Sequence, residues 1–249
     1  DGERESTWTT WYINGNKKFL ASYSDGKLNG KYIRWYEGGI IKELDGEYFN
    51  NKKHKKWIYW SKNGQKTEEI NYNNGVHQGS HIKWFGEKSD QHKKFHINYK
   101  DGNKDGNWHH WYSSGVDSLK ATYLNGEKDG HWIWWRKNGL KDKEGFYKKE
   151  KKHGLWTIWN DSTGSAYHKL HEETYVNDAI DGKVTKWYKE GGLDRQGIMR
   201  GKEKEGEWTY WERGGKRWLK FDYGDGLEKV TLGEIEERDG ITFKIGKYE

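Results

Sequence analysis

Histidine and lysine are the residue types in this 249-residue chain whose positions could support chemistry. Histidines occur as the pair His109-His110 and singly at His131 and His153, and His92 and His96 lie near one another. A metal site needs several ligands that converge and are themselves held by hydrogen bonds, and these positions show no such spacing. The chain has no cysteine, and no Ser/His/Asp arrangement or phosphate-binding loop stands out. We therefore interpret the histidines as solvent-facing and expect no catalytic residue, no metal, no cofactor and no enzymatic activity.

Lysines form two dense clusters, which are the stronger pointer to a binding surface. Both replace a turn that recurs along the chain, so we expect them on one long edge of the fold, where an anionic partner could bind. A solvated turn is the simpler interpretation. Nucleic acid is not expected, because residues 155–249 carry 16 Lys and Arg against 19 Asp and Glu. The clusters comprise Lys52, Lys53, Lys55 and Lys56, and Lys148, Lys149, Lys151 and Lys152.

The tryptophans reveal the repeated elements that hold these histidines and lysines in place. One tryptophan, which we name the ruler tryptophan, recurs nine times at spacings of 24, 25, 24, 27, 24, 24, 28 and 24 residues. A period of this length indicates an array of structural repeats. The ruler tryptophans are Trp11, Trp35, Trp60, Trp84, Trp111, Trp135, Trp159, Trp187 and Trp211.

Each repeat reads as a β-hairpin, for which residues 106–130 are a good example. Asn-Gly or Ser-Gly pairs join its two strands, and Asp-Gly or Asn-Gly pairs lead into the next repeat, and these residues tolerate the positive φ of tight hairpin turns. Proline, which would interrupt a ladder of hydrogen bonds, is absent. Hydrophobic residues make up only 31%, against about 45–50% in globular domains, which favours a thin structure. The sequence therefore predicts an all-β, elongated, single-layer antiparallel β-meander of about nine 24-residue hairpins.

The array should span residues 1–226, and residues 227–249 should form a degenerate hairpin that caps it. Asp1-Gly2 aligns with Asp25-Gly26, so we expect that residue 1 is not the natural start. Insertions within residues 86–95 and 161–171 should project from the Asn-Gly edge, either as a binding margin or as neutral loop variation.

Alternation along the strands assigns side chains to two faces. The ruler tryptophan shares its face with a β-branched residue in eight of nine repeats, and we expect it to cover a small residue of its own hairpin, forming a structural seam. The other face of the first strand varies between repeats, so we expect it to meet water or a partner. Its candidate binding residues are Arg34, Tyr59, Lys83, His110, Trp134 and Tyr210.

The pattern G-x-W-x-x-W-Y-x-x-G followed by Y-x-N-G-x-x-D-G resembles the MORN repeat, and more closely the bacterial variant in proteins named YwqK family antitoxins. The resemblance covers residues 1–226. It implies an elongated, twisted single-layer sheet with a binding or scaffold role and no catalysis. Family members are linked to protein assembly, to lipid headgroups and to toxin neutralisation. The double tryptophan departs from the eukaryotic pattern.

Two functional interpretations remain open. The chain could be a scaffold that binds a protein partner or assembles with itself into a filament, with toxin neutralisation as a special case. It could instead bind glycans on exposed rings such as Tyr59 and Trp134, although these rings could equally pack against each other across strands. No apolar run reaches the ~18 residues of a membrane span. The Cys-free, Asn-, Lys- and Gly-rich composition is compatible with an exported or cell-surface bacterial protein.

Overall fold

The computed structural model describes residues 3–86, 92–161, 166–224, 229–238 and 241–248, with side chains as far as Gly224. The described residues contain no helix. The chain divides into two compact units, of which the first comprises residues 1–127 and 137–139 and the second residues 128–136 and 140–249.

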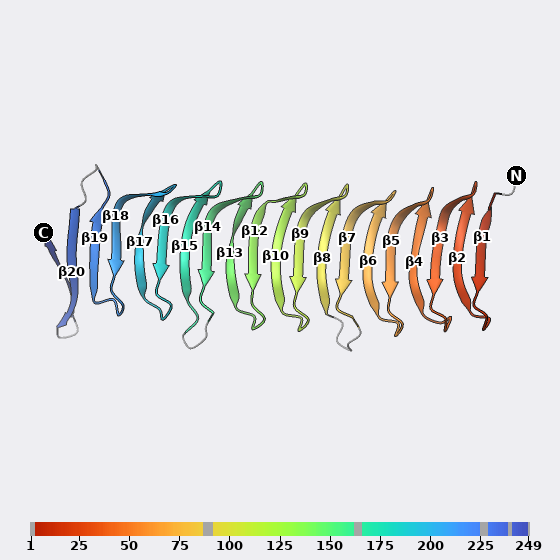
Figure 1. Ribbon diagram of the computed structural model, residues 1–249, viewed down its shortest axis with the longest axis horizontal. Coiled ribbons are helices and arrows are strands. Elements are labelled where there is room, and N and C mark those ends of the chain that lie inside the picture. The colour runs from red at the N-terminus through yellow and green to blue at the C-terminus, as the bar shows by residue number, and fades with distance from the viewer. Residues whose placement is uncertain (1–2, 87–91, 162–165, 225–228, 239–240, 249) are drawn as a thin grey trace. The chain divides into compact units, whose positions relative to one another are not determined.

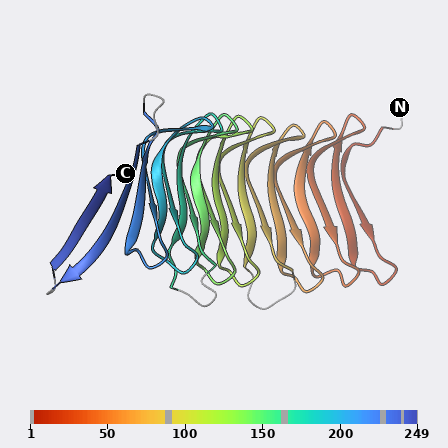
Figure 2. The same ribbon diagram turned by 60° about the vertical axis from the view of Figure 1, so that its left-hand side comes forward.

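The first unit is a meander in which each strand pairs antiparallel with the next along the chain (Figure 1). In both ribbon views its strands lie side by side in one layer (Figure 2). Ten strands at about 4.8 Å spacing make this unit longer across the strands than along them. Its strands are β1 (Ser6–Trp11), β2 (Lys17–Ser24), β3 (Lys27–Trp35), β4 (Lys42–Phe49), β5 (Lys52–Trp60), β6 (Lys66–Asn73), β7 (Val76–Trp84), β8 (Lys93–Lys100), β9 (Asn103–Trp111) and β10 (Asp117–Leu124).

The second unit repeats this arrangement, and the short strand β11 (Glu127–Lys128) contains the boundary between the units. Its pairings again follow the chain from β12 to β21. The prediction of an all-β, single-layer antiparallel meander of hairpins is confirmed. The strands are β12 (Gly130–Trp135), β13 (Lys141–Lys148), β14 (Lys151–Trp159), β15 (Lys169–Val176), β16 (Ala179–Trp187), β17 (Leu193–Arg200), β18 (Glu203–Trp211), β19 (Arg217–Asp222), β20 (Lys229–Arg238) and β21 (Ile241–Tyr248).

The last hairpin, β20 with β21, falls within residues 227–249, where the sequence departs from the repeat. A capping role for it stays a prediction. The two predicted insertions fall partly on residues 87–91 and 162–165, which lie outside the described residues, so their projection from the sheet also stays a prediction.

The turns between repeats adopt positive φ at both central residues, as type I′ turns do. Asp25 and Gly26 have φ of 50° and 69°. The turn before the first lysine cluster uses Asn50 and Asn51 at 46° and 63°, a conformation that asparagine tolerates. This cluster therefore lies in strand β5, and the prediction that it replaces the turn is wrong. Short turns with this local chemistry explain why neighbouring strands pair in chain order.

A second positive-φ position lies inside the first strand of each repeat, where the strand bends. Glycine occupies it in seven repeats, whereas β5 carries Lys55 with φ of 58°. A side chain in this region costs about 1 kcal/mol or more.

We expect Lys55→Gly to raise the free energy of unfolding by about 1 kcal/mol in urea titrations, although it removes an exposed ion pair to Glu47. The reverse change, Gly79→Lys, should lower the free energy of unfolding by a similar amount. Nothing lies within 4 Å of a Cβ added at Gly79, so the cost comes from the positive φ of the backbone alone. Equal stabilities for these two variants would contradict the prediction.

A β-bulge follows the turn of most hairpins and changes which side chains share a face. In the hairpin of β3 and β4, Trp35 pairs with Lys42 but Arg34 pairs with Leu44, so one extra residue lies between. Residues three apart, which would point to opposite faces of a regular strand, are thereby brought together. The Lys42 ammonium lies 2.6 Å from the Asp45 carboxylate. The same ion pair recurs between Lys66 and Glu69, Lys141 and Glu144, and Lys169 and Glu172.

The buried tryptophans lie on the opposite face from the one expected. A Cβ added to Gly46 would lie 2.3 Å from the Trp57 ring, and Gly145 and Trp156, and Gly197 and Trp208, repeat this contact at 2.2 and 2.3 Å. The small residue is therefore covered by the first aromatic residue of the following repeat, across the inter-repeat turn. The expectation that the ruler tryptophan covers the small residue of its own hairpin is wrong.

The ruler tryptophans line the other face and do not form the predicted seam over small residues. Trp11 is 57% exposed, and each of the others is half-buried. By contrast, Trp57 is 1% exposed and Trp156 is 5% exposed. The core therefore lies on the face whose residues vary between repeats. Different residues at the varied positions can pack around the same stack of aromatic rings.

Candidate binding surface

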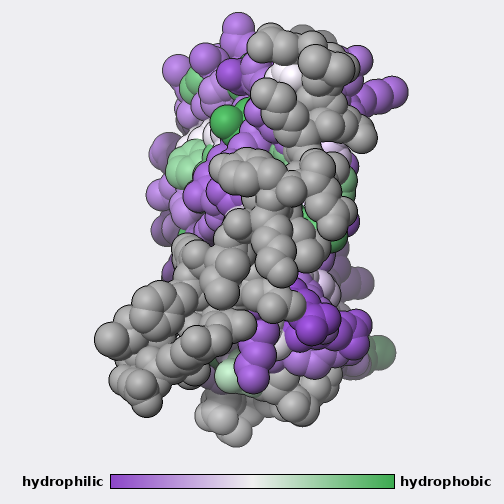
Figure 3. Space-filling model, turned by 90° about the vertical axis from the view of Figure 1, so that its left-hand side faces the viewer, coloured by the Kyte–Doolittle hydropathy of each residue, from purple (hydrophilic) through white to green (hydrophobic). Residues whose placement is uncertain are grey.

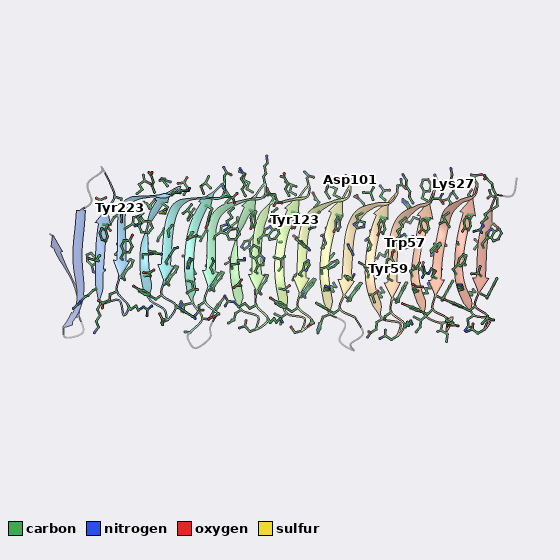
Figure 4. All side chains as sticks on the ribbon, in the orientation of Figure 1. Lys27, Trp57, Tyr59, Asp101, Tyr123 and Tyr223 are labelled. Atoms are coloured by element: carbon green, nitrogen blue, oxygen red, sulfur yellow. The ribbon has the colours of Figure 1, made fainter. Side chains whose placement is uncertain are left out.

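The first face, which we name the stacking face, carries the buried tryptophans and the tyrosines of the second strands. The Trp57 ring packs edge-on against Tyr48 at 4.9 Å and stacks on Tyr32 at 6.0 Å between ring centroids. Its indole N–H donates to the Glu47 carbonyl at 3.0 Å. Figure 4 shows Trp57 and Tyr59 projecting from the same strand, β5. A single-layer sheet gains its apolar burial here, from rings of adjacent repeats.

A cation lies over these rings in six of the nine repeats, four residues before the first aromatic residue. The Lys53 ammonium lies 4.5 Å from the Trp57 ring centroid and 5.3 Å from that of Tyr72. Lysine or arginine over an aromatic face is stabilising, and more so where water is partly excluded. The same contact to the first aromatic residue is made by Arg4, Lys53, Lys104, Lys128, Lys152 and Lys204.

Sequence reasoning missed this cation position. The signal was present, since lysine or arginine stands at the same offset in six repeats. It was hidden because two of these residues, Lys53 and Lys152, belong to the lysine clusters and were interpreted as surface charge.

The predicted aromatic binding residues lie within the stack. The Trp134 ring lies 5.5 Å from Trp132 and 5.9 Å from Trp156. Tyr59 accepts a hydrogen bond from the Lys53 ammonium at 2.7 Å, and burial raises its pKa. Tyr210 packs edge-on against Phe221 at 5.5 Å, and burial raises its pKa as well. Each of these rings is partly exposed and packs against other rings of the stacking face, and sugar binding by them stays a prediction.

The three polar candidates on this face have partners of their own. The exposed Arg34 guanidinium binds both carboxylate oxygens of Glu43, at 2.6 and 2.7 Å from Nη2. The Lys83 ammonium lies 3.8 Å from Glu68. The His110 ring lies between Phe95 and Trp108, at 5.5 and 4.9 Å between centroids.

The two lysine clusters belong to different units, so a shared edge stays a prediction. In the first, Lys55 pairs with Glu47 at 2.7 Å and Lys56 lies 3.8 Å from Glu69, while Lys52 is exposed. In the second, the side chains of Lys148, Lys149 and Lys151 are exposed. Lys53 and Lys152 lie over rings and are not part of a free basic edge.

We expect Lys152→Met to lower the free energy of unfolding by about 0.5–2 kcal/mol, because the ammonium lies 4.6 Å from the Trp156 centroid and 4.7 Å from that of Tyr175. Methionine keeps an unbranched stem, and Lys152→Arg should retain most of the stability. Lys151→Met, at the exposed neighbouring position, is the matched control and should change little. Thermal and urea unfolding measure all three, and equal effects at positions 151 and 152 would argue against the cation–π contact.

The second face, which we name the ruler face, presents apolar rings beside ion pairs. Ruler tryptophans recur there with β-branched residues, and the Lys42 and Lys141 ammonium groups lie 6.0 and 5.4 Å from the ring centroids of the ruler tryptophans Trp60 and Trp159. The backbone beneath these rings is held by side chains of the preceding repeat, since Tyr36 donates to the Trp60 carbonyl and Arg136 to the Trp159 carbonyl, both at 2.8 Å. The ruler face therefore offers partly exposed indoles on a fixed backbone.

The histidines make pairwise contacts and do not converge. His109 lies 2.6 Å from Asp117, and His81 lies 2.8 Å from Glu68. Among the described side chains there is no group of three or more histidines and carboxylates that could hold a metal ion. Burial lowers the pKa of His110, and the nearby Lys104 lowers it further.

No protein-family model matches this chain, and no curated protein matches it. The fold and its surfaces define the class, an all-β protein of repeated tryptophan-rich hairpins. The atoms that Figure 3 colours by hydropathy are mostly hydrophilic, in keeping with a mean hydropathy of −1.31 for the chain. Within the described residues, no helix is long and apolar enough to cross a membrane.

Proposed function

We propose that the chain is a non-catalytic scaffold of the MORN-repeat type that binds another protein on its ruler face. The observation that carries this proposal is the partly exposed tryptophan that recurs in every repeat on that face, beside a β-branched residue in eight of the nine repeats. Tryptophan is enriched among the residues that dominate binding energy at protein interfaces. The paired lysines and carboxylates beside several of these indoles would form a polar rim, as interfaces commonly have. A toxin is one class of partner that such a surface could neutralise.

Photo-crosslinking in cells tests the proposal. A benzophenone amino acid would replace Lys120 on the ruler face or Arg34 on the stacking face, two side chains of similar exposure at 49% and 46%. We expect one discrete protein adduct from position 120 and none from position 34. Trp111→Ala, which removes the ruler tryptophan of the same hairpin, should abolish the adduct. Adducts of equal yield from both faces, or none from position 120, would overturn the proposal.

A glycan is the second candidate ligand, because one specific feature of the ruler face favours it. Ruler tryptophans recur every second strand, which places them about 9.6 Å apart along each unit, and a regular row of indoles suits a polymer with a regular repeat. Retention on insoluble polysaccharide that is lost in Trp60→Ala, with no protein adduct from position 120, would favour this class.

A further inference from the structure

One inter-repeat turn of the second unit brings exposed apolar and exposed basic side chains together. It joins β13 to β14, which lie side by side in Figure 1. Phe146 in β13 is 45% exposed and Leu155 in β14 is 48% exposed. The corresponding positions are polar in every repeat of the first unit, as at Glu47 in β4, Lys56 in β5 and Asn71 in β6.

Both apolar side chains lie on the ruler face. Phe146 precedes Tyr147 and Leu155 precedes Trp156, and successive side chains of a strand point to opposite faces. Tyr147 and Trp156 pack edge-on against each other on the stacking face, at 5.1 Å between ring centroids. A Cβ added to Gly154, the residue before Leu155, would lie 3.9 Å from the Phe146 ring, so the two apolar residues are neighbours across the strands.

Two exposed lysines border this apolar pair on the same face. Lys148 and Lys151 are cross-strand partners beside the turn, and like charges directly opposite one another are destabilising. The carboxylate of the turn is engaged elsewhere, since Glu150 accepts the Lys128 backbone N–H at 2.5 Å and lies 3.4 Å from the Lys128 ammonium. Within the described part of the chain, neither Lys148 nor Lys151 forms an ion pair.

A later turn of the same unit shows how such a charge is balanced inside the chain. Arg200, at the end of β17, holds the position of Lys148. Its guanidinium lies 2.5 Å from the Asp181 carboxylate and 2.8 Å from that of Glu205. The positive charge beside Phe146 therefore stays available to a group outside the chain.

The backbone of the turn between β13 and β14 is strained. Lys149 and Glu150 adopt φ of 49° and 67°, in a region that long side chains rarely enter. The turn between β15 and β16 places Asn177 and Asp178 at 50° and 71°, and these short residues tolerate the conformation. The chain thus keeps charged residues where shorter ones would fold with less strain, and retained strain of this kind is common at binding sites.

We propose that Phe146, Lys148, Lys151 and Leu155, which we name the turn patch, bind an acidic segment of the protein partner. Phe146 and Lys148 are two residues apart in β13, about 7 Å along the strand, so the segment would present an apolar side chain and a carboxylate at that separation. Complementary charge both attracts such a segment and fixes its register. The proposal rests on the proposed function, because the turn patch is part of the ruler face, and it adds the chemistry of the partner.

An anionic membrane is also attracted by exposed apolar residues and lysines, but the surroundings of the turn patch do not suit it. The Glu144 and Glu172 carboxylates lie on the same face, 2.9 Å from Lys141 and 2.5 Å from Lys169. A flat layer of lipid headgroups over the turn patch would be pressed against these carboxylates, whereas a single protein segment can pass beside them. The observations therefore favour a protein segment.

Selection of a phage-displayed library of random peptides on the immobilised 249-residue chain tests the proposal. We expect the enriched peptides to combine Asp or Glu with an apolar residue, and their binding to weaken as the ionic strength rises. The double variant Lys148→Glu with Lys151→Glu should raise the Kd of an enriched peptide at least about tenfold, and Phe146→Ser should do the same. Fluorescence anisotropy of the labelled peptide measures each Kd.

Lys202→Glu and Ile198→Ser are the matched controls. Lys202 is exposed in the turn between β17 and β18, and Ile198, which holds the position of Phe146, is 42% exposed. Both variants should bind the enriched peptide like the wild type, and circular dichroism establishes that every variant is folded. A peptide with Lys in place of its acidic residues should bind the double variant more tightly than the wild type, which separates a charge contact from a defect of folding.

Enriched peptides without acidic residues, or equal losses in the control and test variants, would overturn the proposal. Binding to vesicles of equimolar phosphatidylcholine and phosphatidylserine, lost in the double variant while no peptide is enriched, would overturn it in favour of a membrane. The adduct from position 120 reports partner binding separately. If that adduct forms and no acidic peptide is enriched, the acidic partner is overturned and the proposed function stands. If acidic peptides bind the turn patch and position 120 gives no adduct, the proposed function fails and the turn patch stands.

Discussion

Replacing Gly46 by alanine is expected to lower the free energy of unfolding by about 2–3 kcal/mol, the range for overpacking a tight site. The new Cβ would lie 2.3–2.8 Å from three atoms of the Trp57 ring, and this ring is 1% exposed and held by the Glu47 carbonyl. The indole would have to leave its place, with loss of its contacts to Tyr48 and Lys53. Urea denaturation followed by tryptophan fluorescence measures both the stability and the exposure of the ring.

Gly38→Ala is the matched control for this substitution. Gly38 lies in the same unit, its φ is not positive, and nothing lies within 4 Å of an added Cβ, so the expected change is within about 0.5 kcal/mol of zero. A Gly46→Ala variant as stable as the Gly38→Ala variant would show that the contact between Gly46 and Trp57 does not hold the repeats together.

The neighbouring repeat supplies a compensating pair. There Ile70 stands at the position of Gly46, and His81, its cross-strand partner, stands at that of Trp57. We expect Gly46→Ile alone to be strongly destabilising and the double variant Gly46→Ile with Trp57→His to recover part of the loss. The double-mutant cycle isolates the interaction between the two positions. Strict additivity would contradict a fit set by size.

Acidification from pH 7.5 to pH 5 is expected to destabilise the first unit through the histidines of the fourth and fifth repeats. Burial lowers the pKa of His77, His96, His109 and His110, so the folded unit binds fewer protons than the unfolded chain, whose histidines titrate near 6.5. Their contribution is therefore complete above pH 6.5 and is lost as the pH falls through the lowered values.

The groups that face these rings act in both directions. Positively charged or titratable neighbours lower the pKa of three of these histidines further. They are Lys104 and Lys94 for His110, Lys53 and His81 for His77, and Lys93 and His109 for His96. Asp117 raises that of His109 and Glu68 that of His77, against the effect of burial. The pKa values of Asp117 and Glu68 are themselves lowered, so these carboxylates reduce the stability of the fold only below about pH 4.5. A loss of stability between pH 6.5 and 5 is therefore due to the histidines.

Thermal unfolding across this pH range is the measurement, with His110→Phe as the test variant. Phenylalanine can occupy the place between Phe95 and Trp108 without titrating, so the variant should lose less stability on acidification than the wild type. His131→Phe, in the second unit, should follow the wild type. An unfolding midpoint that does not change between pH 7.5 and 5 would contradict the prediction.

The period, the turns and the antiparallel meander could be predicted from the sequence because they depend on local chemistry. Asp25-Gly26 and its equivalents dictate a type I′ turn, and short turns leave the next strand only one place to pair. The alternation of side chains also predicted correctly that Tyr48 and Gly46 share a face.

The choice of the buried face could not be predicted in this way. Both faces carry an aromatic residue in nearly every repeat. The alternation of side chains shows which residues share a face, but it does not show which face is buried. The decision depends on contacts across the inter-repeat turn, where Gly46 leaves room for Trp57 and Lys53 covers its ring. Uniformity of the ruler tryptophan suggested a core, but in most hairpins that residue pairs beside the bulge that follows the turn, and its ring stays partly exposed.

The fit between Gly46 and Trp57 also determines how such a chain can lengthen or shorten. The sequence repeat begins with one hairpin, but the packing unit is offset by half a repeat and consists of a second strand with the first strand that follows it. Recombination within the turn inside a hairpin keeps each second strand with the first strand that packs on it. Recombination within a turn between repeats can instead join Ile70 to a tryptophan or Gly46 to a histidine. Duplications that copy whole packing units would therefore keep every such contact. The order of the remaining repeats is limited, because each second strand must be followed by a first strand whose residue fits it in size.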